Sequence, residues 1–106
     1  MSGFILVLTT VPEEKTGGEI GRVLVEERLA ACVTISPAAR SIYRWEGKIC
    51  DEREHILVIK TRSELFPRIE TRIKALHPYK VPEIIALSIE NAAPDYLAWL
   101  GDETGT

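Results

Sequence analysis

The chain has 106 residues, of which 45% are hydrophobic and 27% are charged, and its formal net charge is −3. This length and composition predict one soluble globular domain spanning residues 1–106, with a core that needs no disulfides to fold. The negative charge argues against nucleic acid or an anionic membrane as a partner, and no apolar run approaches membrane-spanning length.

The cysteine content and the N-terminal residues bear on the compartment. Cys32 and Cys50 are too few to form a disulfide framework. The first residues have neither the basic region nor the small-residue cleavage site of a secretory signal. We therefore expect reduced thiols and a cytoplasmic protein.

The first part of the chain predicts a strand and a helix. Residues 4–8 form an apolar run typical of a buried strand, and Pro12 ends it. The segment Thr16-Gly17-Gly18-Glu19 has the spacing of a capping box, and an apolar stripe of helical period follows to about Ala30. Gly21 inside this helix costs about 1 kcal/mol relative to alanine.

The middle of the chain predicts extended structure. Residues 32–35 form a second strand that Pro37 is expected to end. Residues 41–61 favour a long β-hairpin, because alternating and β-branched residues flank the pair Glu46-Gly47, where glycine permits a tight turn.

The last part predicts a helix, a strand and a short helix. Ser63 is expected to cap the first helix and Pro78 to end it. An apolar strand over residues 84–89 follows, and Pro94 opens the terminal helix. Residues 101–106 are expected to be frayed.

The resulting order is β-α-β-β-α-β followed by a short C-terminal helix. This order predicts the ferredoxin-like α+β sandwich, in which two helices cover one face of an antiparallel sheet.

Three predicted strands are apolar on both faces, although only one face of a two-layer sheet meets helices. They cover residues 4–8, 56–59 and 84–87. An uncovered apolar face of this size favours burial against other copies of the chain. The alternative is a monomer whose terminal helix covers the face, although that helix is short for three strands.

The run from His77 to Glu83 carries an imidazole, a phenol, an amine and a carboxylate between two prolines. Proline disfavours helix in the residue before it, so the run must end a helix and lead into a strand. His77 then lies at a helix C-terminus, where the dipole favours a charged imidazole. Such a rigid connection is either a structural corner or a small binding site.

Several motifs, in order along nearly the whole chain, closely resemble the CutA family of divalent-cation tolerance proteins. They are Glu26–Val33, Ser41–Ile49, His77–Tyr79, Val81–Leu87 and Tyr96–Trp99.

The resemblance implies a ferredoxin-like homotrimer in which long hairpins pair across subunits. It also implies a cytoplasmic protein linked to copper and divalent-metal tolerance. Some members carry cysteine at the position of Thr9 and a second histidine at that of Leu76, groups implicated in copper binding; of that set this chain keeps His77. The family usually has asparagine where this chain has Thr34, and often glutamate where it has Lys80.

The candidate metal ligands are His77, Glu83 and Cys32, for copper(II) or another divalent cation, because thiolate and imidazole suit copper and carboxylate suits harder ions. An extended connection separates His77 from Glu83 by about 20 Å, so a shared metal would need a neighbouring chain. The alternatives are a corner histidine that bonds helix carbonyls and a cysteine that packs as a small hydrophobe.

Tyr43 and Trp45 are predicted to share one face of the hairpin, and Tyr79 belongs to the rigid run. These three aromatic residues indicate a ligand cleft or a trimer interface, and one surface can serve both purposes.

No pattern indicates a catalytic set, a phosphate loop or an organic cofactor site, so we expect a protein that is not an enzyme. The leading hypothesis is a trimer that binds divalent metal weakly. The alternatives are a trimeric module resembling the PII proteins, which bind small ligands between subunits, and a structural trimer that anchors partners.

Overall fold

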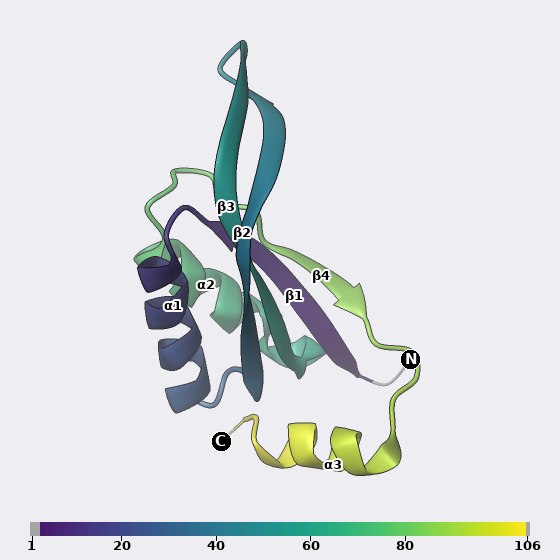
Figure 1. The fold of residues 1–106 in the computed structure, drawn as a ribbon. Helices are drawn as coiled ribbons and strands as arrows, with labels where there is room; N and C mark the ends of the chain where they lie inside the picture. The colour runs from purple at the N-terminus through teal and green to yellow at the C-terminus, as the bar shows by residue number, and fades with distance from the viewer. Residues whose placement is uncertain (1–2, 106) are drawn as a thin grey trace.

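The computed structural model describes residues 3–105. The elements are β1 (Phe4–Val11), α1 (Glu14–Glu26), β2 (Cys32–Trp45), β3 (Lys48–Arg62), the 3-10 turn η1 (Ser63–Leu65), α2 (Phe66–Leu76), β4 (Ile85–Ser88) and α3 (Pro94–Asp102). Across these residues the strands form an antiparallel sheet in the order β2-β3-β1-β4 (Figure 1). The predicted ferredoxin-like α+β fold is confirmed.

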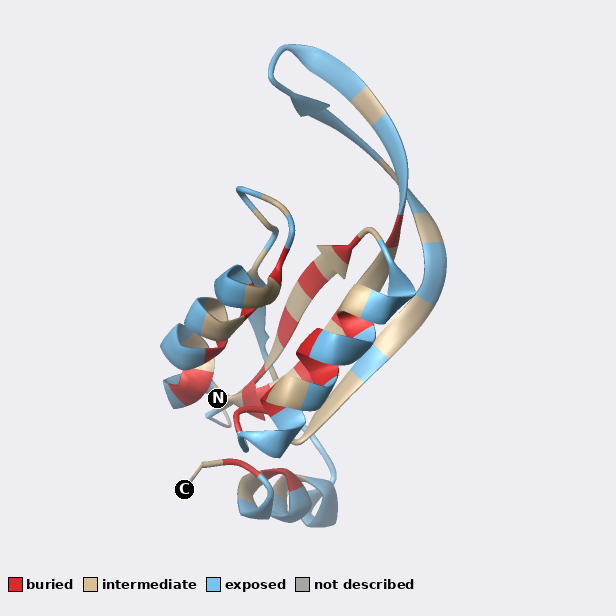
Figure 2. Cartoon of the chain, turned by 90° about the vertical axis from the view of Figure 1, so that its left-hand side faces the viewer, coloured by how far each residue is buried: buried red, intermediate tan, exposed pale blue. Residues whose placement is uncertain are grey.

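The core lies between one face of the sheet and the helices α1 and α2. Alternate residues of β1 are buried on this face, as a period of two requires, and Val7 and Val11 are fully covered. Ile20 and Leu24 of α1, and Ile69 of α2, meet them from the other layer. In Figure 2 the buried residues gather at this helix–sheet contact, whereas the far end of the hairpin is exposed. No helix within residues 3–105 combines the length and apolar character needed to span a bilayer.

Helix α1 begins two residues before Thr16, where the capping box was expected. Glu13 is the extended N-cap residue, and no side chain caps the helix. The helix also ends at Glu26 rather than near Ala30, because Arg28 adopts a φ of 60° that a helix cannot continue.

The glycines of α1 allow the helix to lie close against the sheet. A β-carbon on Gly17 would be 3.1 Å from a methyl group of Leu57, and one on Gly21 would be 3.2 Å from a methyl group of Val33. The loss in helix propensity at Gly21 is therefore offset by close packing of two layers.

The two strands predicted before and after Pro37 are one continuous strand, β2. The register shifts between Ile35 and Ala38, which marks a bulge at the proline. Proline is tolerated there because β2 is an edge strand, so its missing N–H removes no ladder bond at the bulge.

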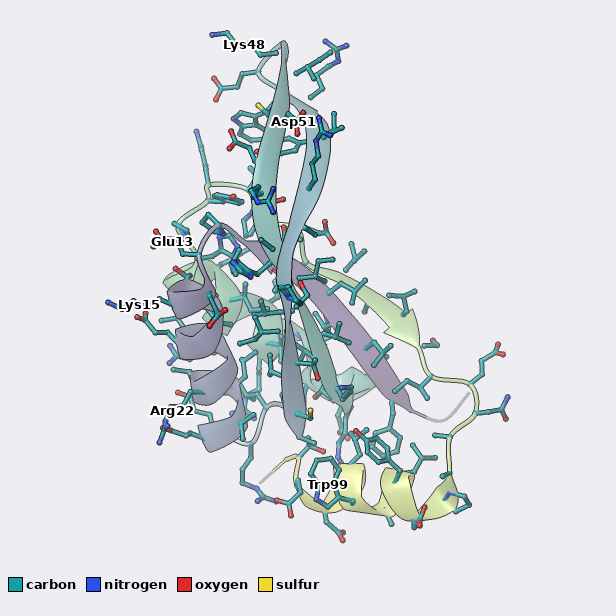
Figure 3. All side chains as sticks on the ribbon, in the orientation of Figure 1. Glu13, Lys15, Arg22, Lys48, Asp51 and Trp99 are labelled. Atoms are coloured by element: carbon teal, nitrogen blue, oxygen red, sulfur yellow. The ribbon has the colours of Figure 1, made fainter. Side chains whose placement is uncertain are left out.

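The β2–β3 hairpin projects beyond the rest of the sheet (Figure 1) and gives the molecule extents of 44, 25 and 24 Å. Glu46 and Gly47 have φ values of 49° and 76°, the positive pair of a type I′ turn, which confirms the predicted position of the turn. Lys48 and Asp51 lie on the projecting arm, while Trp99 lies on α3 at the opposite end of the molecule (Figure 3).

Two boundaries in the second half differ from expectation. Ser63 begins a 3-10 turn, without a capping bond from its side chain, and α2 follows from Phe66. β4 covers only Ile85–Ser88, because it pairs with β1 alone, over Ile5–Leu8.

The C-terminal segment is held in place up to residue 105, which contradicts the frayed end predicted for residues 101–106; Thr106 lies outside the described residues. Arg62 donates hydrogen bonds to Thr104 Oγ1 (2.9 Å) and to the carbonyl of Gly101 (2.5 Å). Arg28 donates to the carbonyls of Asp102 (2.5 Å) and Gly105 (3.0 Å).

Helix α3 does not cover the open face of the sheet, which we define as Leu6, Leu8, Val58, Ile85 and Leu87. The helix lies at the end of the sheet (Figure 1), where Gly101 approaches Phe4 and Arg62. Ile85 and Leu87 remain 50% and 48% exposed. The terminal helix therefore does not shield this face, although the monomer alternative had expected it to.

The buried hydroxyl of Thr9 allows a prediction about stability. Thr9 and Thr61 are both fully buried, but Thr61 Oγ1 donates to the carbonyl of Leu29, whereas Thr9 Oγ1 has no partner among the described residues. We expect Thr9→Val to raise the free energy of unfolding by about 1 kcal/mol, because an unpaired buried hydroxyl is removed. Thr61→Val, the matched control, should lower it by about the same amount. Urea denaturation of both variants checks this, and a destabilised Thr9→Val would contradict it.

Candidate functional site

A cleft of about 710 Å³ runs along the hairpin arm, from Glu54 near its root to Glu46 at its turn, and faces the loop between α2 and β4. β2 contributes Ser41, Tyr43 and Trp45, and β3 contributes Glu54. The loop contributes residues 78–81, which form the facing wall. The cleft is therefore built from segments far apart in the sequence.

The aromatic wall of the cleft follows from strand geometry. Ser41, Tyr43 and Trp45 are alternate residues of β2, so their side chains point to the same face. Tyr43 is 38% and Trp45 42% exposed. The structure thus brings Tyr43 and Trp45 to one cleft with Tyr79, the third aromatic residue predicted for this region.

His77 fastens the loop to the sheet. The residue is 8% exposed, and its ring lies 4.8 Å from the ring of Tyr79 with the two planes tilted by 51°. The backbone N–H of Tyr79 donates to Nδ1 (3.1 Å), so Nδ1 is unprotonated. Nε2 must then carry the proton that it donates to the carbonyl of Thr10 on β1 (2.6 Å).

This hydrogen-bond pattern requires a neutral imidazole with the proton on Nε2. At the end of α2 the ring is therefore held by two backbone groups, the N–H of Tyr79 at Nδ1 and the carbonyl of Thr10 at Nε2. The corner histidine that bonds a carbonyl is present, although the carbonyl belongs to β1 and not to a helix.

Tyr79 in turn fixes Glu54. Its hydroxyl donates to Oε2 of Glu54 at 2.8 Å. Burial of the ring, followed by the bond and the charge of Glu54, raises the pKa of Tyr79 well above its usual value. Burial, with smaller contributions from Cys50 and Glu54, also raises the pKa of Tyr43. Both phenols therefore stay neutral near pH 7, and Tyr79 remains a hydrogen-bond donor.

Glu54 is a carboxylate with an unusual environment. It is only 5% exposed, and no lysine or arginine within residues 3–105 forms an ion pair with it. A buried carboxylate without a cation is costly, and one phenol bond compensates only part of that cost. The cleft therefore favours a positively charged group beside Glu54.

The predicted metal ligands do not converge within one chain. Glu83 lines the cleft, whereas both ring nitrogens of His77 are already occupied by backbone groups. Cys32 pairs with Lys60, which is level with Leu6. It therefore lies about 13 Å along the strand direction, and two strands to the side, from Thr10, the residue whose carbonyl His77 contacts. No three metal-binding side chains within residues 3–105 form a group that would hold an ion.

Cys32 lies instead among polar groups at the start of β2. Its sulfur is 3.7 Å from Nζ of Lys60 and 3.8 Å from Oγ1 of Thr34, and Lys60 also donates to that hydroxyl at 2.9 Å. The thiol is partly exposed, so it is not the buried hydrophobe of the alternative interpretation.

Sequence reasoning missed Glu54, the residue at the centre of the cleft. Its register opposite Ala39 places it on the same face as Tyr43, and that register runs unbroken from the turn and stops short of the shift between Ile35 and Ala38. Counting back from the Glu46-Gly47 turn, which the sequence does predict, would have paired Glu54 with Ala39 and revealed the shared face.

Comparison with known proteins adds a family relationship. The family model described as CutA1 divalent ion tolerance protein matches residues 5–103. A Thermus thermophilus relative named divalent-cation tolerance protein CutA is 51% identical over 100 residues, covering 94% of this chain and 97% of the relative. A solved structure of that organism's protein superposes with a TM-score of 0.94, at 50% identity, over 96% of this chain and 99% of the other.

Relatives come from more than one compartment. An Arabidopsis thaliana relative named Protein CutA, chloroplastic, is 43% identical over 94% of this chain, which spans 55% of that protein's length. A structure of the Archaeoglobus fulgidus protein, described as periplasmic, has a TM-score of 0.91 at 35% identity over 94% of this chain and 97% of the other.

Proposed function

Because this chain belongs to the CutA1 divalent ion tolerance protein family, we propose that it acts as a non-enzymatic homotrimer that binds divalent cations weakly and serves cellular tolerance to them. The main observation that supports a trimer is the open face of the sheet. It presents apolar side chains from three strands, and no element within residues 3–105 covers it.

The projecting hairpin supports the same assembly. Ile42 and Ile49 on its arm are 63% and 69% exposed. An isolated two-stranded hairpin is marginally stable in water, so an arm of this length is best explained by packing against other subunits. Pairing through the edge strands β2 and β4 would also satisfy their free backbone groups.

The cation is proposed to be copper(II) or another divalent ion, bound near Glu83 and His77. To bind a metal, His77 must give up its hydrogen bond to Thr10 or to Tyr79, and this cost supports weak binding. Cys32 would join such a site only through a neighbouring chain. The location is proposed to be cytoplasmic, where the cysteines, both free, remain reduced.

Calorimetric titration of copper(II) tests the metal assignment. We expect weak binding to the wild-type protein, weakened further in Glu83→Gln and His77→Gln. Glu90→Gln, which removes an exposed carboxylate outside the cleft, is the matched control. If all four proteins bound copper(II) equally, the assignment of the metal site to Glu83 and His77 would be wrong.

A small-ligand module resembling the PII proteins is the second candidate, and the 710 Å³ cleft favours it. The third candidate, a structural trimer that anchors partners, rests on the exposed apolar arm alone. A pull-down that recovers a stoichiometric partner without metal would favour the third over the other two.

A further inference from the structure

We propose that the cleft binds a protonated aliphatic amine, whose ammonium group is held by the carboxylate of Glu54 while Tyr43 covers its alkyl chain. This goes beyond the proposed function, and it holds whether or not the protein binds metal.

The charge of the lining favours a cation over an anion. Glu46, Glu54 and Glu83 line the cleft against one basic residue, Lys80. Lys80 is exposed, so its ammonium group can remain in water. Glu54 is 5% exposed, so its carboxylate is largely shielded from water. A bound ammonium group would supply the counter-ion that Glu54 lacks among the described residues.

The aromatic lining favours an organic cation over a metal ion. Aromatic faces attract ammonium groups within about 6 Å and also cover alkyl groups, but they do not ligate hard cations. Tyr43 and Trp45 offer exposed ring surface on one side of the cleft. No three metal-binding side chains group together within residues 3–105, so carboxylates here suit a cation that needs one or two acceptors.

The carboxylate is held in place before any ligand arrives. The hydroxyl of Tyr79 donates to Oε2 of Glu54, which leaves Oε1 as the acceptor for an N–H donor. Tyr79 is itself held by His77, whose ring contacts the ring of Tyr79 in a tilted arrangement and makes two hydrogen bonds. A preorganised acceptor lowers the entropy cost of binding, so a small amine needs few contacts.

Titration calorimetry in EDTA, with n-butylammonium as the probe and uncharged n-butanol as its matched ligand, tests the proposal. We expect saturable binding of n-butylammonium at millimolar concentrations and no comparable binding of n-butanol. Glu54→Gln should weaken amine binding by about tenfold or more, as loss of a charged hydrogen bond does. Equal binding of the amine and the alcohol would overturn the proposal.

Glu52→Gln is the matched control, because it removes a carboxylate two residues away on β3 that does not line the cleft. It should change the affinity less than about twofold, as expected for a screened surface charge. If Glu52→Gln and Glu54→Gln lowered the affinity for the amine equally, the loss would come from the general negative charge of the surface. Such a result would contradict a site at Glu54.

Tyr43→Leu gives a second test that does not depend on a buried residue, because Tyr43 is 38% exposed. Removing the ring while keeping an apolar side chain should weaken amine binding by about three- to tenfold, because the aromatic surface over the alkyl chain is lost. Unchanged binding in this variant, or no amine binding by a wild-type trimer whose neighbouring chain fills the cleft, would overturn the proposal. Failure of copper binding would leave these results unaffected, since EDTA is present throughout.

Discussion

Replacing Leu87 by lysine is expected to convert the proposed trimer into folded monomers. Leu87 is 48% exposed in the single chain, so lysine there costs the monomer little. In a trimer that buries the open face, three uncompensated ammonium groups would be placed in apolar contacts at several kcal/mol each. The concentration at which the subunits dissociate should therefore rise by more than about a thousandfold.

Val25→Lys is the matched control for this prediction. Val25 is 43% exposed and lies on α1, on the side of the molecule away from the open face. Sedimentation equilibrium should give about three times the 11.9 kDa chain mass for the wild type and for Val25→Lys, and the single-chain mass for Leu87→Lys. A trimeric Leu87→Lys would place the interface elsewhere and remove the main support for the proposed assembly.

The fold could be predicted because each main helix and strand is specified by residues within its own segment. Apolar strands, a helical stripe and prolines at element ends placed every main element, and Glu46-Gly47 placed the turn. The sequence signals failed where tertiary contacts decided the outcome. Pro37 was read as the end of a strand, whereas its position on a sheet edge allows the strand to continue through a bulge.

The candidate site was predictable only in part for the same reason. Tyr43, Trp45 and Tyr79 were found because aromatic residues on one strand face or in a rigid loop are visible in sequence. Glu54 was missed because its role depends on burial beneath Tyr79, 25 residues away. His77 was recognised, but its partners at Thr10 and Tyr79 are backbone groups, which carry no sequence signal.

His77→Ala is expected to lower the free energy of unfolding by about 2–4 kcal/mol, in EDTA and without any metal. The substitution leaves the carbonyl of Thr10 and the N–H of Tyr79 without their partner. Each such group costs about 1–2 kcal/mol, in the lower part of the range for buried groups, because both hydrogen bonds are only part-buried. It also removes the ring that contacts the ring of Tyr79. Urea denaturation at one fixed protein concentration measures the change, because a trimer's stability depends on concentration.

Two comparisons separate this structural role from metal ligation. His55→Ala removes the other histidine, whose Nδ1 lies 2.9 Å from the carbonyl of Ser36, and it should cost about 1 kcal/mol because one bond is lost rather than two. His77→Gln, whose amide can donate to Thr10 in place of Nε2, should recover part of the stability lost in His77→Ala. If EDTA instead lowers wild-type stability to that of His77→Ala, metal rather than backbone hydrogen bonding is what His77 contributes, and the neutral corner role is wrong.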